Sequence, residues 1–318
     1  MKNLGKLFAM AAAMAMAVGF VANAQAEGHD DPVKIVVITH MPTASDFGNV
    51  VRNGSEFAAK EVGAELQYFA PETYDMVWMA QAVDAAIATR PDALALSLPD
   101  ADALGPGVKL AVDAGIPVIT INSGITQFKE LGALMHVGQA EFDAGYGAGV
   151  GLREAGGTKG LCVNQEVGNV ALDERCAGFR EGFQGEVTEL ATTSDVTEFK
   201  NAVAAHLQQD PETDSVIILW AGLADPLVQA VESVDRTGTI NLGTFDLNES
   251  ALNYVLEGTL LFAIDQQPFM QGYMPVVLLN NLVRYGLFPA NPVLKTGPNL
   301  VTKDNAAQVI DLSKQGLR

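Results

Sequence analysis

The chain has 318 residues, and 38 acidic against 19 basic side chains give it a formal net charge of −19 at pH 7. Nucleic-acid binders need a surplus of positive charge, so the composition excludes that class of partner. Hydrophobic residues make up 48% of the chain, which is enough apolar material for the core of one large domain or two medium-sized ones.

The first 26 residues have the pattern of a secretory signal peptide. Lys2 and Lys6 precede an apolar run over residues 7–21, and Ala24-Gln25-Ala26 supplies the small-x-small cleavage motif. A membrane anchor is the alternative, but a bilayer-spanning helix needs about 20 apolar residues, and this run is shorter. We expect cleavage after Ala26, export to the periplasm and a mature chain that is not embedded in a membrane.

Short β-branched runs then alternate with helical patterns, which predicts βαβ units and parallel sheets. The first series comprises strands at 34–39, 65–69, 93–97 and 117–121, with helices at 46–62, 76–89 and 107–114. The second series comprises strands at 159–163, 186–191, 215–220 and 240–245, with helices at 172–183, 197–208 and 224–235.

The two series are an internal repeat. Matching positions are separated by a nearly constant offset of 122 to 127 residues in four pairs, which are Lys34 and Lys159, Asp92 and Asp214, Ile116 and Ile240, and Leu134 and Leu261. We therefore predict an α/β protein of two similar doubly wound parallel-sheet lobes.

Each series is followed by a further short strand, at 134–137 and 261–265, where we expect the chain to cross between lobes. A third crossing is expected at 295–302, which gives a three-strand hinge. The N-terminal lobe would comprise residues 27–132 and 267–293, including a helix at 269–284. The C-terminal lobe would comprise residues 133–266 and 294–318, including a terminal helix at 303–315.

The two cysteines, Cys162 and Cys176, are an even count in a chain that we expect to be exported, which favours a disulfide. Two buried thiols are the alternative. A zinc site is disfavoured because neither a CxxC motif nor a close histidine pair accompanies them.

Ligands of open parallel sheets bind beyond the carboxyl ends of the strands, so two facing lobes predict a single cleft. Carboxylate and amide groups suit vicinal hydroxyls, the planar guanidinium of Arg175 offers a fork of donors, and aromatic rings cover the C–H faces of a sugar. The cleft residues expected to bind a small sugar or polyol are Asp46, Phe47, Asn122, Ser123, Asn169, Arg175, Trp220, Asp246 and Gln266.

Structural alternatives stay open for four of these residues. Asp46 could cap the first helix, and Asp246 could cap the turn at Asn248. Trp220 could belong to the edge of the core, and Arg175 could be a surface ion-pair partner.

Signatures of enzymes are missing from the sequence, which has no GxSxG elbow, P-loop, HExxH or CxxC motif. The glycine-rich run at 145–151 lacks GxGxxG spacing and falls within a helical pattern, so we expect it to let a helix pack tightly on its sheet. We expect no catalysis, no cofactor and no metal. An exported sugar-acting enzyme and a sugar-responsive regulator are the disfavoured alternatives.

Several segments resemble the type I periplasmic binding proteins of the ribose- and galactose-binding kind. They are KIVVITH, NGSEFAAKEVG, RPDALALSLPDADALGPGVKLAVDAGIPVITINS, ERCAGF, GTFD and FAIDQQP, and the resemblance spans essentially the whole mature chain. It implies a monomeric extracytoplasmic receptor that delivers its solute to the permease of an ABC importer. A sensory receptor that feeds a chemoreceptor or a histidine kinase is the alternative function.

The resemblance carries ligand contacts to Phe47, Asn122, Arg175, Asp246 and Gln266. Three positions depart from the ribose-type pattern: Gly48 replaces an aromatic residue, Ser123 an arginine, and Trp220 an amide. A related pentose, a hexose, a tetritol or a cyclic polyol is therefore as compatible with the site as ribose.

Overall fold

A computed structural model describes residues 31–318, so the expected signal peptide and its cleavage site lie outside the described residues. Two six-stranded sheets organise these residues. The first sheet has the order β11-β5-β4-β3-β1-β2, and its strands are β1 (Lys34–Ile38), β2 (Glu65–Phe69), β3 (Ala93–Ser97), β4 (Val118–Ile121), β5 (Met135–Gln139) and β11 (Val293–Gly297).

The second sheet has the order β12-β10-β9-β8-β6-β7. Its strands are β6 (Lys159–Asn164), β7 (Glu186–Ala191), β8 (Ser215–Ile218), β9 (Asn241–Phe245), β10 (Phe262–Asp265) and β12 (Asn299–Thr302). All neighbours are parallel except β12, which runs antiparallel to β10. The strand order repeats from one sheet to the other, which confirms the prediction of two doubly wound lobes.

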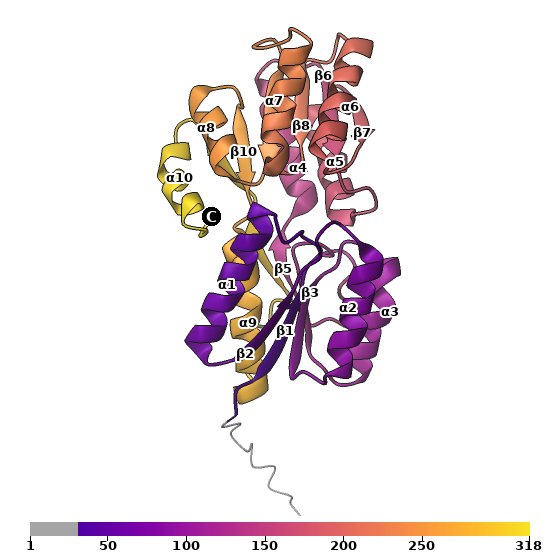
Figure 1. The fold of residues 1–318 in the computed structure, drawn as a ribbon, viewed down its shortest axis with the longest axis vertical. Coiled ribbons are helices and arrows are strands. Elements are labelled where there is room, and N and C mark those ends of the chain that lie inside the picture. The colour runs from indigo at the N-terminus through magenta and orange to yellow at the C-terminus, as the bar shows by residue number, and fades with distance from the viewer. Residues whose placement is uncertain (1–30) are drawn as a thin grey trace, which may run out of the picture. The chain divides into compact units, whose positions relative to one another are not determined.

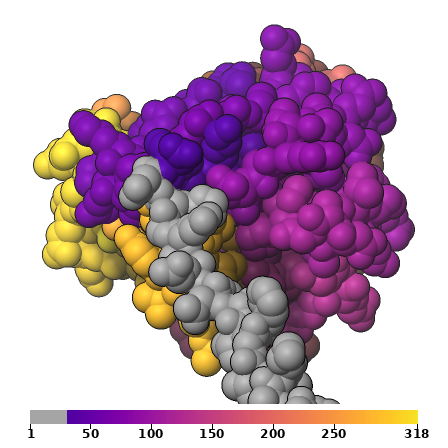
Figure 2. Space-filling view, turned by 90° about the horizontal axis from the view of Figure 1, so that it is seen from below, coloured from indigo at the N-terminus to yellow at the C-terminus, as the bar shows by residue number. Residues whose placement is uncertain are grey.

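Helices cover both faces of the first sheet (Figure 1). Along β1, Ile35 and Val37 point to one core and Val36 and Ile38 point to the other, as the alternation of a strand requires. The first core is covered by α1 (Asp46–Val62) and α9 (Pro268–Tyr285), and the second by α2 (Met76–Ala88) and α3 (Ala101–Asp113). Figure 2 shows orange residues of α9 beside indigo and purple residues of the first series, and α9 packs on α1.

The second sheet is also covered on both faces. One face packs on α4 (Glu141–Glu154) and α5 (Val170–Phe183). The other packs on α6 (Val196–Gln209), the 3-10 turn η1 (Ala221–Leu223), α7 (Ala224–Ser233), α8 (Glu249–Glu257) and α10 (Ala306–Lys314). Helix α10 contacts α8 and contributes Ala306 and Val309 to this core.

The chain passes between the sheets after β5, after β10 and between β11 and β12. Strand β5 pairs with β4, with Met135 beside Ile119, and β11 extends the same sheet to Gly297. The expected lobe boundary at 133 precedes β5, and the one at 294 falls within β11, and both of these strands pair in the first sheet.

Glycines bring two pairs of helices into close contact. A Cβ at Gly145 of α4 would overlap the Arg175 carbonyl oxygen of α5, and a Cβ at Gly178 would overlap the Phe142 carbonyl oxygen. The pair α1 and α9 repeats this arrangement through Gly272. The glycine-rich run therefore packs α4 principally on helix α5, whereas the sequence analysis expected it to pack on a sheet.

Two helices differ from the sequence prediction. Helix α3 begins at Ala101, six residues earlier than predicted, because Asp100 Oδ1 accepts the amides of Asp102 and Ala103 and caps a turn that runs through Pro106. Helix α8 has no predicted counterpart, although Asn248 Oδ1 accepts the Ala251 amide at 2.7 Å and caps it. Within residues 31–318, no helix has the length and apolar character needed to cross a membrane.

Candidate ligand-binding site

A cavity of about 180 Å³ lies between the carboxyl ends of the strands of the two lobes, several times the ~30 Å³ that one water occupies. Six of the nine predicted ligand-binding residues line it, which are Phe47, Asn122, Arg175, Trp220, Asp246 and Gln266. The cavity has further polar walls outside the nine predicted residues, among them His40, Gln165, Glu166 and Ser194.

Asn122 and Asp246 occupy equivalent places in the repeat, directly after β4 and β9. Both have left-handed backbones, with φ of 59° and 67°, which turn the chain sharply where each strand ends. Gln266 connects them, because its Oε1 accepts from Asn122 Nδ2 at 3.1 Å and its Nε2 donates to Asp246 Oδ1 at 2.6 Å. Gln271 of α9 donates to Gln266 Oε1 at 3.0 Å and completes this chain of polar groups.

Arg175 lies in the second turn of α5, where three contacts hold its side chain. Its Nε donates to Glu141 Oε2 at 2.6 Å, its Nη1 donates to the Leu219 carbonyl at 2.9 Å, and its guanidinium carbon lies 4.6 Å from the centroid of the Phe245 ring. Burial lowers the pKa of Arg175, but the nearby carboxyl groups of Glu141, Asp246 and Glu166 together more than offset this, and the pKa is raised. Arg175 is buried and paired inside the site, so the surface ion-pair interpretation is wrong.

The Asp246 carboxyl lies in the same cavity and is 6% exposed. Burial raises the pKa of Asp246 to about 7, and the charge of Arg175 and the hydrogen bond from Gln266 only partly oppose this. Asn248 rather than Asp246 caps the following helix. Within the described part of the chain, Asp246 Oδ2 and Arg175 Nη2 have no protein partner, so an acceptor and a donor remain available to a ligand.

The two aromatic residues serve both the cavity and the core. Phe47 lines the cavity and is also buried in the core of the first lobe. Trp220 lines the cavity and is half-buried against the core of the second lobe. Trp220 therefore lies at the edge of the core and at the cavity wall together.

Three predicted residues lie outside the cavity lining. Asp46 is exposed at the first position of α1, where the N-cap is Ser45, whose Oγ accepts the Gly48 amide at 3.2 Å. Ser123 Oγ donates to Asn169 Oδ1 at 3.2 Å, so these two residues contact each other across the lobes. The N-cap of α1 is therefore Ser45, and the interpretation of Asp46 as the N-cap is wrong by one residue.

Further contacts hold the lobes together beside Asn169. The Val170 amide donates to the Pro99 carbonyl at 2.9 Å, and Thr126 Oγ1 donates to Glu174 Oε1 at 3.0 Å. Asn169 Nδ2 lies 3.4 Å from His40 Nε2. The N-terminal end of α5 is thus docked on the strand ends of the first lobe, and the cavity is closed on this side.

Two important residues had weak signals in the sequence. His40 directly follows β1 at the expected edge of the sheet, and burial lowers its pKa to about 3. Glu141 follows β5, beyond the strand ends that the analysis considered, and its partnership with Arg175 joins positions 34 residues apart. Only the packing of α4 against α5 reveals that contact.

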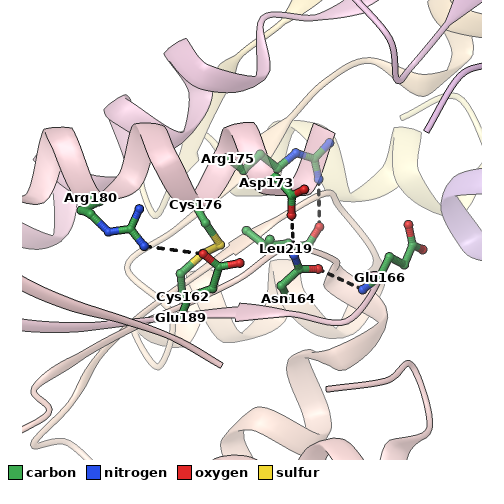
Figure 3. The surroundings of a disulfide bond; sticks show 9 residues. All are labelled: Cys162, Asn164, Glu166, Asp173, Arg175, Cys176, Arg180, Glu189 and Leu219. Atoms are coloured by element: carbon green, nitrogen blue, oxygen red, sulfur yellow. Dashed lines mark hydrogen bonds and ion pairs between the residues drawn. A yellow bond between two sulfur atoms is a disulfide. The ribbon is translucent and has the colours of Figure 1, made fainter. Parts of the chain in front are cut away.

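The predicted disulfide is confirmed, because Cys162 of β6 is bonded to Cys176 of α5. Cys176 directly follows Arg175 on α5, and Figure 3 shows the Arg175 side chain extending away from the disulfide, with its guanidinium bonded to the Leu219 carbonyl. The bond therefore ties the helix that presents Arg175 to strand β6 of its sheet.

The repeated lobes, the hinge and the cavity between strand ends define a class of bilobal receptors. The chain belongs to the periplasmic binding proteins: the family model described as periplasmic binding protein domain matches residues 35–286. In the part of the chain that the structure describes, no cluster of histidine, cysteine and acidic residues could hold a metal ion.

Individual relatives agree with this family. A carbohydrate transporter from Acidothermus cellulolyticus, solved in complex with myo-inositol, is 36% identical, with a TM-score of 0.86, and the alignment covers 91% of this chain and all of that one. A xylose/arabinose-binding protein from Sulfolobus acidocaldarius is 25% identical, with 86% of this chain and 71% of the relative covered. A ribose import binding protein from Escherichia coli is 24% identical, with 84% and 88% covered.

Proposed function

We propose that the protein captures one neutral cyclic polyol or monosaccharide in the interlobe cavity and delivers it to an ABC importer. The observation that supports this most strongly is the set of unpaired polar atoms that converge there between Phe47 and Trp220. The lining includes the donor Arg175 Nη2 and the acceptor Asp246 Oδ2, which suit a ring that carries hydroxyls on adjacent carbons.

Closure of the lobes makes such recognition selective. A buried donor or acceptor without a partner costs about 1–3 kcal/mol, so a ligand that lacks one matching hydroxyl is penalised. Phe47 and Trp220 can cover the apolar C–H faces of the ring. A small, saturated and highly hydroxylated ligand satisfies both kinds of wall.

A cyclic polyol is favoured over ribose for two reasons. Ser123, at the position where ribose-type sites have an arginine, is engaged with Asn169 across the lobes. The relative from Acidothermus cellulolyticus holds myo-inositol and shares more than a third of its residues with this chain. We therefore propose myo-inositol or a close analogue as the ligand.

The cellular role follows from the family and from residues 1–26. We propose that the chain is exported to the periplasm, loses its signal peptide after Ala26 and acts as a monomer without catalytic activity. Ribose import binding proteins are among its relatives, which supports delivery to a permease rather than sensing. Mass spectrometry of the exported protein would locate its N-terminus, and light scattering would give its mass.

A thermal-shift panel tests the proposed ligand class. The protein is first unfolded and refolded to remove any co-purified solute, and then incubated with inositols, hexoses, pentoses and tetritols. A ligand that binds only the native state raises the Tm by mass action. At a concentration of 100 times its Kd, it adds about 2.7 kcal/mol to the unfolding free energy. We expect stabilisation by myo-inositol or a related polyol, and no stabilisation across the panel would contradict the proposal.

A further inference from the structure

Glu166 presents an acidic oxygen to the cavity. It lies in the loop between β6 and α5, and its side chain is 15% exposed. Its Oε2 accepts a hydrogen bond from Asn169 Nδ2 at 2.7 Å and lies 3.6 Å from His40 Nε2. Among residues 31–318, Oε1 has no hydrogen-bond partner, although Glu166 lines the cavity.

Residues of both lobes hold this carboxyl in place. Asn169 caps α5 through Oδ1, which accepts the Ala171 amide at 3.1 Å and the Ser123 hydroxyl. His40 is fixed by Ser97, whose Oγ lies 2.8 Å from His40 Nδ1. Because Asn169 belongs to one lobe and His40 to the other, Glu166 acquires its full set of contacts only when the lobes are closed.

Within the described residues, the Glu166 carboxyl has no dedicated counter-ion: burial raises its pKa, and the hydrogen bond from Asn169 and the charge of Arg175 oppose this only in part. Burial keeps the pKa of His40 near 3, so this histidine is neutral and cannot form an ion pair with Glu166 at neutral pH. Arg175 is the one cationic side chain of the lining, and its Nε is already bonded to Glu141. A hydrogen-bond donor supplied from the cavity would therefore meet an acceptor that lacks a partner.

We propose that Glu166 is a specificity-determining ligand contact whose Oε1 accepts a hydrogen bond from one ring hydroxyl of a neutral polyol. This inference rests on the proposed function and adds to it a contact outside the predicted set. Asn169 and His40 act as positioning residues, because they orient the carboxyl without lying beside the hydroxyl. A polyol that bears a carboxylate or phosphate at that carbon would place a second anionic group against this buried acidic side chain, which is unfavourable.

The test is calorimetric titration of the refolded full chain with myo-inositol and with its monodeoxy analogues, each of which lacks one hydroxyl. Glu166→Ala and Glu166→Gln are compared with wild type. Glu181→Gln, at an exposed acidic residue of α5 outside the cavity lining, is the control. We expect Glu166→Ala to weaken the binding of myo-inositol at least tenfold, Glu166→Gln to weaken it severalfold, and Glu181→Gln to change it less than twofold.

The deoxy series separates a ligand contact from an effect on closure. If Glu166 binds one hydroxyl, the analogue that lacks this hydroxyl binds wild type and Glu166→Ala with equal affinity. If Glu166→Ala instead weakened the binding of every analogue by the same factor, Glu166 would act only through closure of the lobes. That result would overturn the proposal. Unchanged affinity of Glu166→Gln and Glu166→Ala for myo-inositol would also overturn it. Absence of any polyol or sugar binding by wild type would instead refute the proposed function, and the contact with it.

Discussion

Glu141 and Arg175 form a buried ion pair that links two helices, with Arg175 Nε 2.6 Å from Glu141 Oε2 and both side chains at most 3% exposed. Gln139 Nε2 donates to the same oxygen at 2.8 Å, whereas Glu141 Oε1 is buried without a partner among the described residues. Because Nε is taken by Glu141 and Nη1 by the Leu219 carbonyl, the guanidinium has one orientation, which leaves Nη2 for the ligand.

From this ion pair we predict that Glu141 affects the affinity for the ligand through Arg175, although we do not expect Glu141 to contact the ligand itself. Glu141→Gln preserves the shape but leaves the Arg175 charge buried and uncompensated. We expect about tenfold weaker binding of the polyol, or ~1.4 kcal/mol, by calorimetry. Glu154→Gln, at an exposed position of the same helix, is the matched control and should bind like wild type. Equal affinities of the two variants would rule out this positioning role.

Asp246 predicts a distinct pH dependence. Its pKa is raised to about 7 in the native state, against about 4 in an unfolded chain, so the native state binds more protons between these values. Its contribution to the unfolding free energy is therefore present at pH 4, falls as the pH rises to 7, and is constant above that. His40 has its pKa lowered to about 3, so its contribution to the unfolding free energy is present above about pH 6.5 and is lost as the pH falls below that value.

Comparison with Asp246→Asn isolates the carboxyl from His40. We expect the unfolding free energy of ligand-free wild type minus that of the variant to decrease between pH 4 and 7, by up to ~4 kcal/mol. The difference should be flat from pH 7 to 9. Chemical denaturation at a series of pH values measures it, and a difference that rises with pH would contradict the burial of this group.

The contact between α4 and α5 predicts opposite effects at two glycines two residues apart. An alanine at Gly145 would overlap the Arg175 carbonyl oxygen, whereas a Cβ at Gly147 would meet nothing within 4 Å. We expect Gly145→Ala to destabilise the protein by about 1–3 kcal/mol, and Gly147→Ala to stabilise it by about 0.5–1 kcal/mol. Urea denaturation of both variants tests this, and equal effects would mean that the helices do not approach so closely.

The disulfide between Cys162 and Cys176 closes a short loop, with a sequence separation of 14. A loop of this length contributes about 3 kcal/mol in the chain-entropy treatment. We expect the Cys162→Ser, Cys176→Ser double variant to lose about that much unfolding free energy, and reduced wild type to behave similarly. Identical stabilities of oxidised and reduced wild type would show that the bond contributes nothing.

Much of the fold could be predicted because the repeat is local in sequence. Helix α1 and strands β2, β3 and β7 begin and end at the predicted residues, since β-branched runs and helical periodicity fix them without reference to distant segments. Helix α3 was predicted too short because Pro106 and its flanking glycines resemble a helix breaker. The place of β5 depends on its pairing with β4, which periodicity does not encode.

The candidate site was predictable where it follows directly from strand ends. Asn122, Arg175 and Asp246 lie where the topology and the family resemblance place them. Ser123 and Asn169 also lie near the cleft, but they contact each other, because the choice between facing a ligand and facing the other lobe depends on how the lobes close. Glu141 could not be found this way, since its importance arises from helix packing across 34 residues of sequence.

The most direct test of the central claim is calorimetric titration of the refolded protein with myo-inositol, beside the Arg175→Ala variant. We predict saturable 1:1 binding by wild type, and a loss of well over 1 kcal/mol of binding free energy in a variant that still folds. Binding by Arg175→Ala with the affinity of wild type would contradict the assignment of the ligand to the interlobe cavity.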